Sequence, residues 1–87
     1  MHTSGLVVTF ADDPPLARGA QLELAAAGPF TLGDANGPCR AVALEAADPK
    51  AAREWHEWAE GLPGVVGVEV VFVHWDEAEQ EVSHVGA

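Results

Sequence analysis

The segment from residue 48 to residue 75 constrains the fold most strongly, because a helix with marked ends leads into a long apolar strand. Asp48 can cap the helix, and Pro49 suits its first position, where the backbone N–H needs no intrahelical partner. Gly61 suits a left-handed residue that ends the helix. The strand that follows is dense in β-branched valine. The C-terminal part of the chain is therefore expected to run from helix to strand.

The N-terminal half repeats this order more faintly. Residues 4–11 alternate as in a strand, and a stretch with helical spacing follows over residues 15–26. A short strand is expected at residues 30–32, and an Asn-Gly turn indicates a hairpin into a strand over residues 40–46. The order β-α-β-β-α-β predicts an α+β, ferredoxin-like plait, in which a four-stranded antiparallel sheet carries both helices on one face.

Alternation along the expected strands assigns side chains to the two faces of the sheet. Those expected beneath the helices are Leu6, Val8, Val42, Leu44, Val66, Val68, Val70 and Phe72. Those expected on the open face are Val7, Thr9, Ala41, Ala43, Val71 and Val73, with Glu45 and Glu69 at its edges. An apolar strip flanked by carboxylates is more than a solvated sheet face needs. It suits an amphipathic helix with positive charge; the alternatives are that the tail or the partner in a weak homodimer covers it.

The charge balance narrows the range of partners. Fourteen acidic residues face four Lys or Arg, which gives a formal net charge of −10. Nucleic acid and anionic membranes are unsuitable partners, because both require clustered basic residues. A cationic partner is attracted instead. The 87 residues predict one domain over residues 1–75 and an acidic, mobile tail over residues 76–87.

The sequence contains no pattern that predicts catalysis, a cofactor or a metal. His56 and Glu60 are one helical turn apart, but a zincin motif needs a second histidine where Glu60 stands, and no third ligand is indicated. Cys39 is the one cysteine, and the sequence positions no base to activate it. The chain opens with no signal-peptide pattern and has no apolar stretch long enough to span a bilayer, so the cytoplasm is the expected compartment.

Three segments together resemble the NapD family, the cytoplasmic assembly chaperones of periplasmic nitrate reductase. They are residues 1–8, the strand Ala-Val-Ala-Leu-Glu-Ala at residues 41–46, and Leu-Pro-Gly-Val-Val at residues 62–66, which leads into the final strand and the acidic tail. The first helix and the hairpin lie outside the resemblance. The chain also departs from the family, because Val73 interrupts the usual aromatic-His ending of the last strand and paired tryptophans occupy the second helix. These departures are typical of a diverged member that serves another enzyme.

The resemblance implies a chaperone without enzymatic activity or a cofactor of its own. Such a protein binds the twin-arginine signal peptide of the nitrate reductase catalytic subunit, or of a related molybdoenzyme precursor, and holds back export until cofactor loading. The peptide-binding residues predicted for this sequence are Val7, Thr9, Ala41, Ala43, Glu45, Glu69, Val71 and Val73.

Two other functions on the same fold remain open. An ACT-like module that senses a small molecule would form a dimer with its ligand near the start of the first helix, but the Pro14-Pro15 loop lacks the glycines that allow close approach. An enzyme of acylphosphatase size needs an anion-binding arginine in a glycine-rich loop, and neither Arg18 nor Arg40 has that setting.

Overall fold

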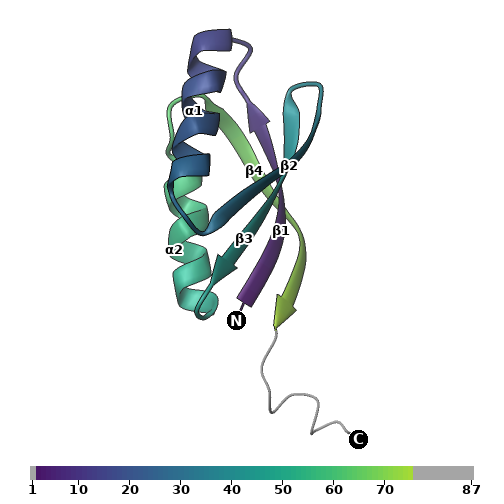
Figure 1. The fold of residues 1–87 in the computed structure, drawn as a ribbon, viewed down its shortest axis with the longest axis vertical. Helices are drawn as coiled ribbons and strands as arrows, with labels where there is room; N and C mark the ends of the chain where they lie inside the picture. The colour runs from purple at the N-terminus through teal and green to yellow at the C-terminus, as the bar shows by residue number, and fades with distance from the viewer. Residues whose placement is uncertain (1, 76–87) are drawn as a thin grey trace, which may run out of the picture.

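The computed structural model describes residues 2–75, so the predicted tail lies outside the described residues. The elements in chain order are β1 (His2–Phe10), α1 (Pro14–Ala26), β2 (Phe30–Asn36), β3 (Cys39–Ala46), α2 (Pro49–Glu60) and β4 (Val65–Trp75), as Figure 1 shows. The predicted β-α-β-β-α-β order is confirmed. The first three strands are longer than predicted, and β2 extends as far as Asn36, where the expected Asn-Gly turn begins.

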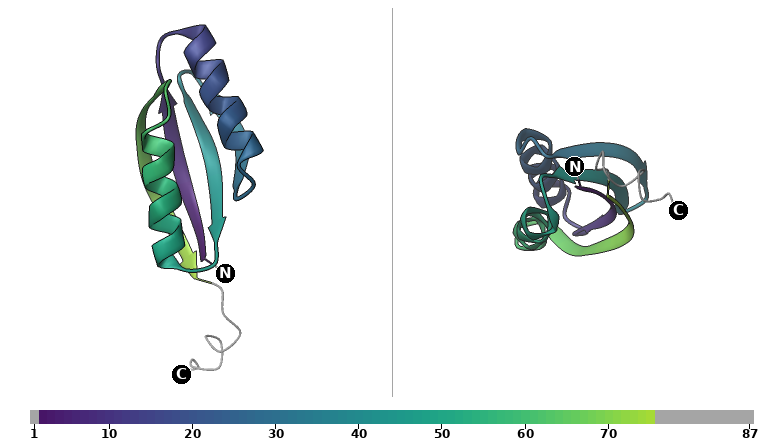
Figure 2. Two further views of the ribbon diagram at one scale, coloured as in Figure 1. Left: turned by 90° about the vertical axis from the view of Figure 1, so that its left-hand side faces the viewer. Right: turned by 90° about the horizontal axis from the view of Figure 1, so that it is seen from below.

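The four strands form one antiparallel sheet in the order β2-β3-β1-β4. Both helices lie on the same side of it, which leaves the other side open (Figures 1 and 2). The ferredoxin-like arrangement predicted from the sequence is therefore confirmed. The β2–β3 hairpin and the C-terminal half of β4 arch away from the helices, which is clear when the molecule is seen end-on (Figure 2).

Each helix begins with an aspartate cap followed by proline, as the sequence predicts for α2. The Asp48 carboxylate accepts a hydrogen bond from the Ala51 backbone N–H at 2.8 Å. Asp13 accepts the equivalent bond from Leu16 at 3.2 Å. Each cap satisfies a backbone donor that has no intrahelical partner.

The end of α2 differs from the prediction. Gly61 is the C-cap but has a right-handed conformation, with φ of −86°. The left-handed residue is Gly64, with φ of 97°. A Cβ on Gly64 would overlap the backbone carbonyl of Leu16, so glycine allows the loop before β4 to pack directly against α1.

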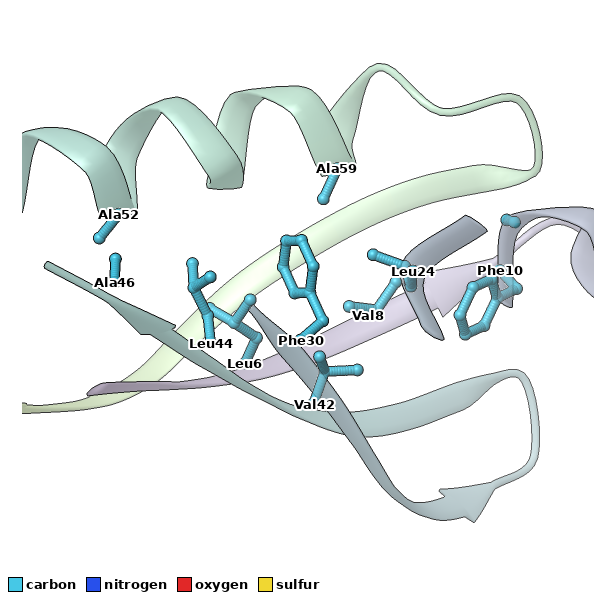
Figure 3. Close-up of a cluster of buried hydrophobic side chains, with 11 residues drawn as sticks. Leu6, Val8, Phe10, Leu24, Phe30, Val42, Leu44, Ala46, Ala52 and Ala59 are labelled. Carbon is cyan, nitrogen blue, oxygen red and sulfur yellow. The ribbon is translucent and has the colours of Figure 1, made fainter. Parts of the chain in front are cut away.

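The core fills the space between the helices and the central strands (Figure 3). Its most buried large side chains are Leu6, Val8, Leu24 and Leu44. The two helix residues Ala52 and Ala59 point down onto the sheet and bring α2 close to it (Figure 3). The remaining buried apolar side chains are Phe10, Ala20, Phe30, Val42 and Ala46.

Three aromatic rings pack together where β2 begins. The ring of Phe30 stacks on Trp58 at a centroid distance of 5.8 Å and meets Trp55 edge-on at 5.7 Å. The two tryptophans also meet each other edge-on at 5.3 Å. These contacts place both tryptophans of α2 in the packing between helix and sheet.

β4 does not follow the alternation that the sequence predicts, because it contains an extra residue. Leu6 on β1 pairs with Val70, whereas Gly5 pairs with Phe72. Val71 is therefore the extra residue of a β-bulge. Beyond a bulge the side chains of a strand exchange faces relative to the regular pattern.

The bulge corrects two predictions. Phe72 was expected beneath the helices, but it lies on the open face and is 55% exposed. Val73 was expected on the open face as a peptide-binding residue, but it pairs with Ser4 and lies on the helix side. The prediction for Val73 was wrong, and Phe72 takes its place on the open face.

A second irregularity lies at the start of β4. Phe10 pairs with Val65 and Thr9 pairs with Gly67, which leaves Val66 without a paired position. Val66 was expected in the core but is 66% exposed.

Val70 is the third core prediction that fails. It lies on the helix side, opposite Leu6, but remains 48% exposed because this half of β4 arches away from α2. Val68 is the one residue of the predicted β4 set that packs against the core.

Candidate functional site

The open face of the sheet is built on alternate residues of β1. Gly5 lies between Ala43 on β3 and Phe72 on β4. Two residues further along, Val7 lies between Ala41 on β3 and Glu69 on β4. The predicted site residues that this face brings together are Val7, Thr9, Ala41, Ala43, Glu45, Glu69 and Val71.

Phe72 lies on this face although the sequence pattern did not predict it there. The ring of Phe72 lies directly over Gly5, since a Cβ built on Gly5 would overlap the ring atoms. A glycine in the middle of a strand often marks a close approach of this kind. Gly5 was therefore the one signal in the sequence that could have placed an aromatic ring on this face.

The centre of the open face is hollowed. The hollow has a volume of about 280 Å³, and its lining includes the small residues Gly5, Ala41 and Ala43, here called its floor, and the larger Val7 and Thr31. Val71 and Phe72 flank it, with 58% and 55% of their surface exposed. Large exposed apolar side chains gathered beside a hollow are typical of a binding surface.

The only acidic side chains that β1, β3 and β4 present beside this hollow are Glu45 and Glu69. Glu45 lies opposite Thr3 on β1, and Glu69 lies opposite Val7 on the other side of β1. Both are exposed. The two carboxylates therefore lie on opposite sides of β1 and at different heights along it, with the apolar hollow between them.

All four lysine and arginine side chains of the protein lie elsewhere. Arg18 belongs to α1, and Lys50 and Arg53 belong to α2. Arg40 belongs to β3, but its guanidinium points to the helix side, where Nη1 donates to Gln21 Oε1 of α1 at 2.7 Å. The open face thus carries the two carboxylates without a lysine or arginine, and His74, which pairs with Thr3 opposite Glu45, is its histidine.

The ion pairs that the described residues form are confined to α2. Lys50 donates to Glu54 at 3.0 Å, and this hydrogen bond, with the attraction of the carboxylate, raises the pKa of Lys50 above its ordinary value. His56 Nε2 lies 3.1 Å from Glu60 Oε2. Exposed pairs of this kind stabilise a helix slightly and leave the open face unaffected.

Three larger hollows lie on the helix side. The first, of about 400 Å³, lies between α2 and the ends of β1 and β4 and is lined by Arg53 together with Glu57 and Glu60. The second, of about 620 Å³, lies between α1 and β2 and includes Arg18 and Arg40. The third, of about 330 Å³, lies between α1 and the end of α2 and includes Glu23 and Trp58. Arg18 and Arg40 make the second hollow unfavourable for a cationic ligand. The hollow on the open face differs from the first and the third in its almost wholly apolar lining.

The described residues do not assemble a catalytic or metal-binding group. Cys39 Sγ lies 3.4 Å from Thr9 Oγ1 on the open face, with no base within this pair. Between residues 2 and 75, no cluster of three His, Cys, Asp or Glu side chains could hold a metal ion. Neither described helix is long and apolar enough to cross a membrane.

Comparison with known proteins identifies the fold. No family model and no curated protein matches the chain. The solution structure of the E. coli Tat proofreading chaperone protein NapD is similar to it, with a TM-score of 0.69 and 20% sequence identity. The match covers 93% of this chain and 84% of that chain. At this identity the similarity establishes a shared fold, and the neighbour comes from the same family that the sequence resembles.

Proposed function

We propose that this protein is a cytoplasmic chaperone of the NapD type, which binds the twin-arginine signal peptide of a molybdoenzyme precursor. The precursor of a periplasmic nitrate reductase catalytic subunit is the first candidate. Binding would hold back export until the cofactor is loaded. The observation that carries the proposal is the open face, where an apolar hollow lies between two carboxylates and no lysine or arginine is present.

The chemistry of such a peptide complements this face. A twin-arginine signal carries two adjacent positive charges, followed by an apolar segment. The apolar segment would lie along the hollow, where burial of Val71 and Phe72 supplies most of the affinity. The arginines would approach Glu45 or Glu69, and exposed charges of this kind chiefly determine association rate and specificity.

Two further findings support the proposal. The sequence resembles the NapD family in three segments, and a Tat proofreading chaperone has the same fold. The surface needs no catalytic group for this role, because a chaperone of this kind acts by covering its ligand.

Calorimetric titration with a synthetic twin-arginine signal peptide tests the proposal directly. The Arg-Arg peptide should bind more tightly than otherwise identical Lys-Lys and Ala-Ala peptides, since arginine can pair with a carboxylate through two parallel hydrogen bonds. Raising the salt concentration should weaken binding, because the Debye length falls to about 10 Å at 0.1 M ionic strength. If no twin-arginine peptide from the host binds better than its Ala-Ala control, the proposed function is wrong, and the ACT-like alternative becomes the better hypothesis.

A matched pair of valines locates the binding surface. Val71 and Val73 are neighbours on β4 and similarly exposed, but they lie on opposite faces of the sheet. Val71→Asp should weaken peptide binding at least about tenfold, because a charge in the apolar contact must be desolvated. Val73→Asp should leave it nearly unchanged. An equal loss for both variants would place the peptide across the edge of β4 and not on the open face.

A further inference from the structure

The hollow on the open face is shaped by the size of its lining residues. Its floor at Gly5, Ala41 and Ala43 carries no side chain longer than a methyl group, and the larger side chains of Val7 and Thr31 lie beside it. Gly33 of β2 continues this floor beside Ala41. The ring of Phe72 rises from the β4 side. The hollow is therefore deep because the Phe72 ring rises well above the hydrogen atom and methyl groups of its floor.

The bulge at Val71 creates this wall. Without it, regular alternation would place Phe72 beneath the helices, and no aromatic ring would stand beside Gly5. Gly5 is equally necessary, because any side chain at this position would occupy the volume that the ring now fills. Two features far apart in the sequence thus combine to form a single cavity.

The volume and lining of the hollow limit what it can hold. Sites for small molecules and cofactors usually have volumes of roughly 300–1,000 Å³, so 280 Å³ lies below that range. It is several times the roughly 30 Å³ that one water molecule occupies in the liquid. The lining offers almost no polar group for orienting a polar ligand. One large apolar side chain fits both the size and the chemistry.

The two carboxylates lie close enough to act together with such an anchor. Glu45 is two residues along β3 from Ala43, which is about 7 Å. Glu69 is separated from Ala41 by the width of β1, which is about 10 Å between the outer strands. An arginine side chain spans much of either distance, so charge recognition and an apolar anchor can belong to the same short peptide segment.

We infer that this hollow is a specificity pocket for one bulky apolar side chain, leucine or larger, located within a few residues of the arginine pair in the bound peptide. The inference rests on the proposed function and adds to it that affinity is concentrated at one apolar position. A few well-packed anchors usually carry most of the binding energy of an interface. Phe72 and the alanine floor then determine which precursors are accepted.

Filling the hollow tests the inference. Ala41→Leu places three more carbon atoms over the floor at an exposed position of β3, where the folded state has room for them. Ala43→Leu is a second variant with the same purpose. Ala26→Leu, at the exposed end of α1, is the matched control on the opposite layer. Thermal unfolding of all three variants confirms that each is folded before binding is measured.

The peptides are the synthetic twin-arginine signal peptide and variants in which each bulky apolar residue after the arginines is replaced singly by alanine. On the wild-type protein, one replacement should weaken binding about tenfold to a hundredfold, the effect of burying one such side chain, and the others should have little effect. Ala41→Leu should weaken binding of the intact peptide to a similar extent. On this variant, the alanine replacement to which the wild type is sensitive should weaken binding no further. Ala26→Leu should bind as the wild type does.

The outcomes separate this inference from the proposed function. If the Arg-Arg peptide binds better than its Ala-Ala control, but both filled variants bind it as tightly as the wild type, the function stands and the pocket is wrong. The pocket is also wrong if the loss is spread evenly over all apolar positions. If the Arg-Arg and Ala-Ala peptides bind equally, the proposed function fails, and the pocket inference fails with it.

Discussion

Replacing Gly5 by alanine should reveal the position of Phe72 through the stability of the protein. A Cβ on Gly5 would overlap three atoms of the Phe72 ring, namely Cδ2, Cε2 and Cζ. These atoms are the far end of a side chain that is 55% exposed, so the ring can rotate into solvent without a backbone shift. Gly5→Ala therefore exchanges the ring contact for a methyl group.

The expected magnitude follows from the burial of the ring. Complete burial of a phenylalanine side chain contributes roughly 1.5–3 kcal/mol, and Phe72 is a little less than half buried, so displacing it costs about 1 kcal/mol. Alanine in place of glycine inside a strand returns roughly 0.5–1 kcal/mol. Gly5→Ala alone should thus change stability by less than about 1 kcal/mol. In a Phe72→Ala background the ring is absent, and Gly5→Ala should stabilise the protein by roughly 0.5–1 kcal/mol.

Urea unfolding of the wild type, the two single variants and the double variant measures the coupling between Gly5 and Phe72. We expect a coupling energy of about 1 kcal/mol, since neighbours in contact are not additive. A parallel cycle with Val73→Ala is the control, because Val73 lies on the other face and should be additive within about 0.5 kcal/mol. Additive effects of Gly5→Ala and Phe72→Ala would show that the ring does not lie over Gly5, as expected if β4 kept the regular alternation without a bulge at Val71.

Two further predictions concern stability. Val68→Asp should lower the free energy of unfolding by about 3 kcal/mol or more, because Val68 packs against the core and the new charge would be unpaired. Val71→Asp should lower it by less than about 0.5 kcal/mol, since Val71 is exposed. Equal losses in thermal or urea unfolding would mean that the face assignment of β4 is wrong. Asp48→Ala should cost about 1 kcal/mol through loss of the α2 cap, and Lys50→Ala should cost less than about 0.5 kcal/mol, so a larger effect for Lys50 would contradict the capping argument.

Sequence patterns determined most of the fold because several signals agreed. The alternation of β1 and β3 placed Leu6, Val8, Val42 and Leu44 correctly in the core, and all four are buried. The cap at Asp48 and the prolines at the helix starts predicted where the helices begin. In these elements the spacing of apolar residues indicates both the type of secondary structure and which side chains face the core.

β4 could not be predicted in the same way, because its sequence is apolar at both parities. Val70 and Phe72 flank the bulge at Val71, and Val65 and Gly67 flank the irregularity at Val66, so no polar residue marks either position where the alternation changes. Only tertiary structure decides where the register shifts. The position of Phe72 follows from Gly5, 67 residues earlier in the chain, and a local pattern cannot connect the two.

The net charge and the apolar face are best understood together. A domain that leaves Val71 and Phe72 exposed risks association with a second copy through the same surface. A charge of −10 opposes that association, and it also disfavours nucleic acid and anionic membranes. The same charge would attract a cationic ligand, and no lysine or arginine beside the hollow would oppose its approach to the open face. Charge thus excludes most of the partners that an exposed apolar surface would otherwise bind, and it favours a peptide that is both basic and apolar.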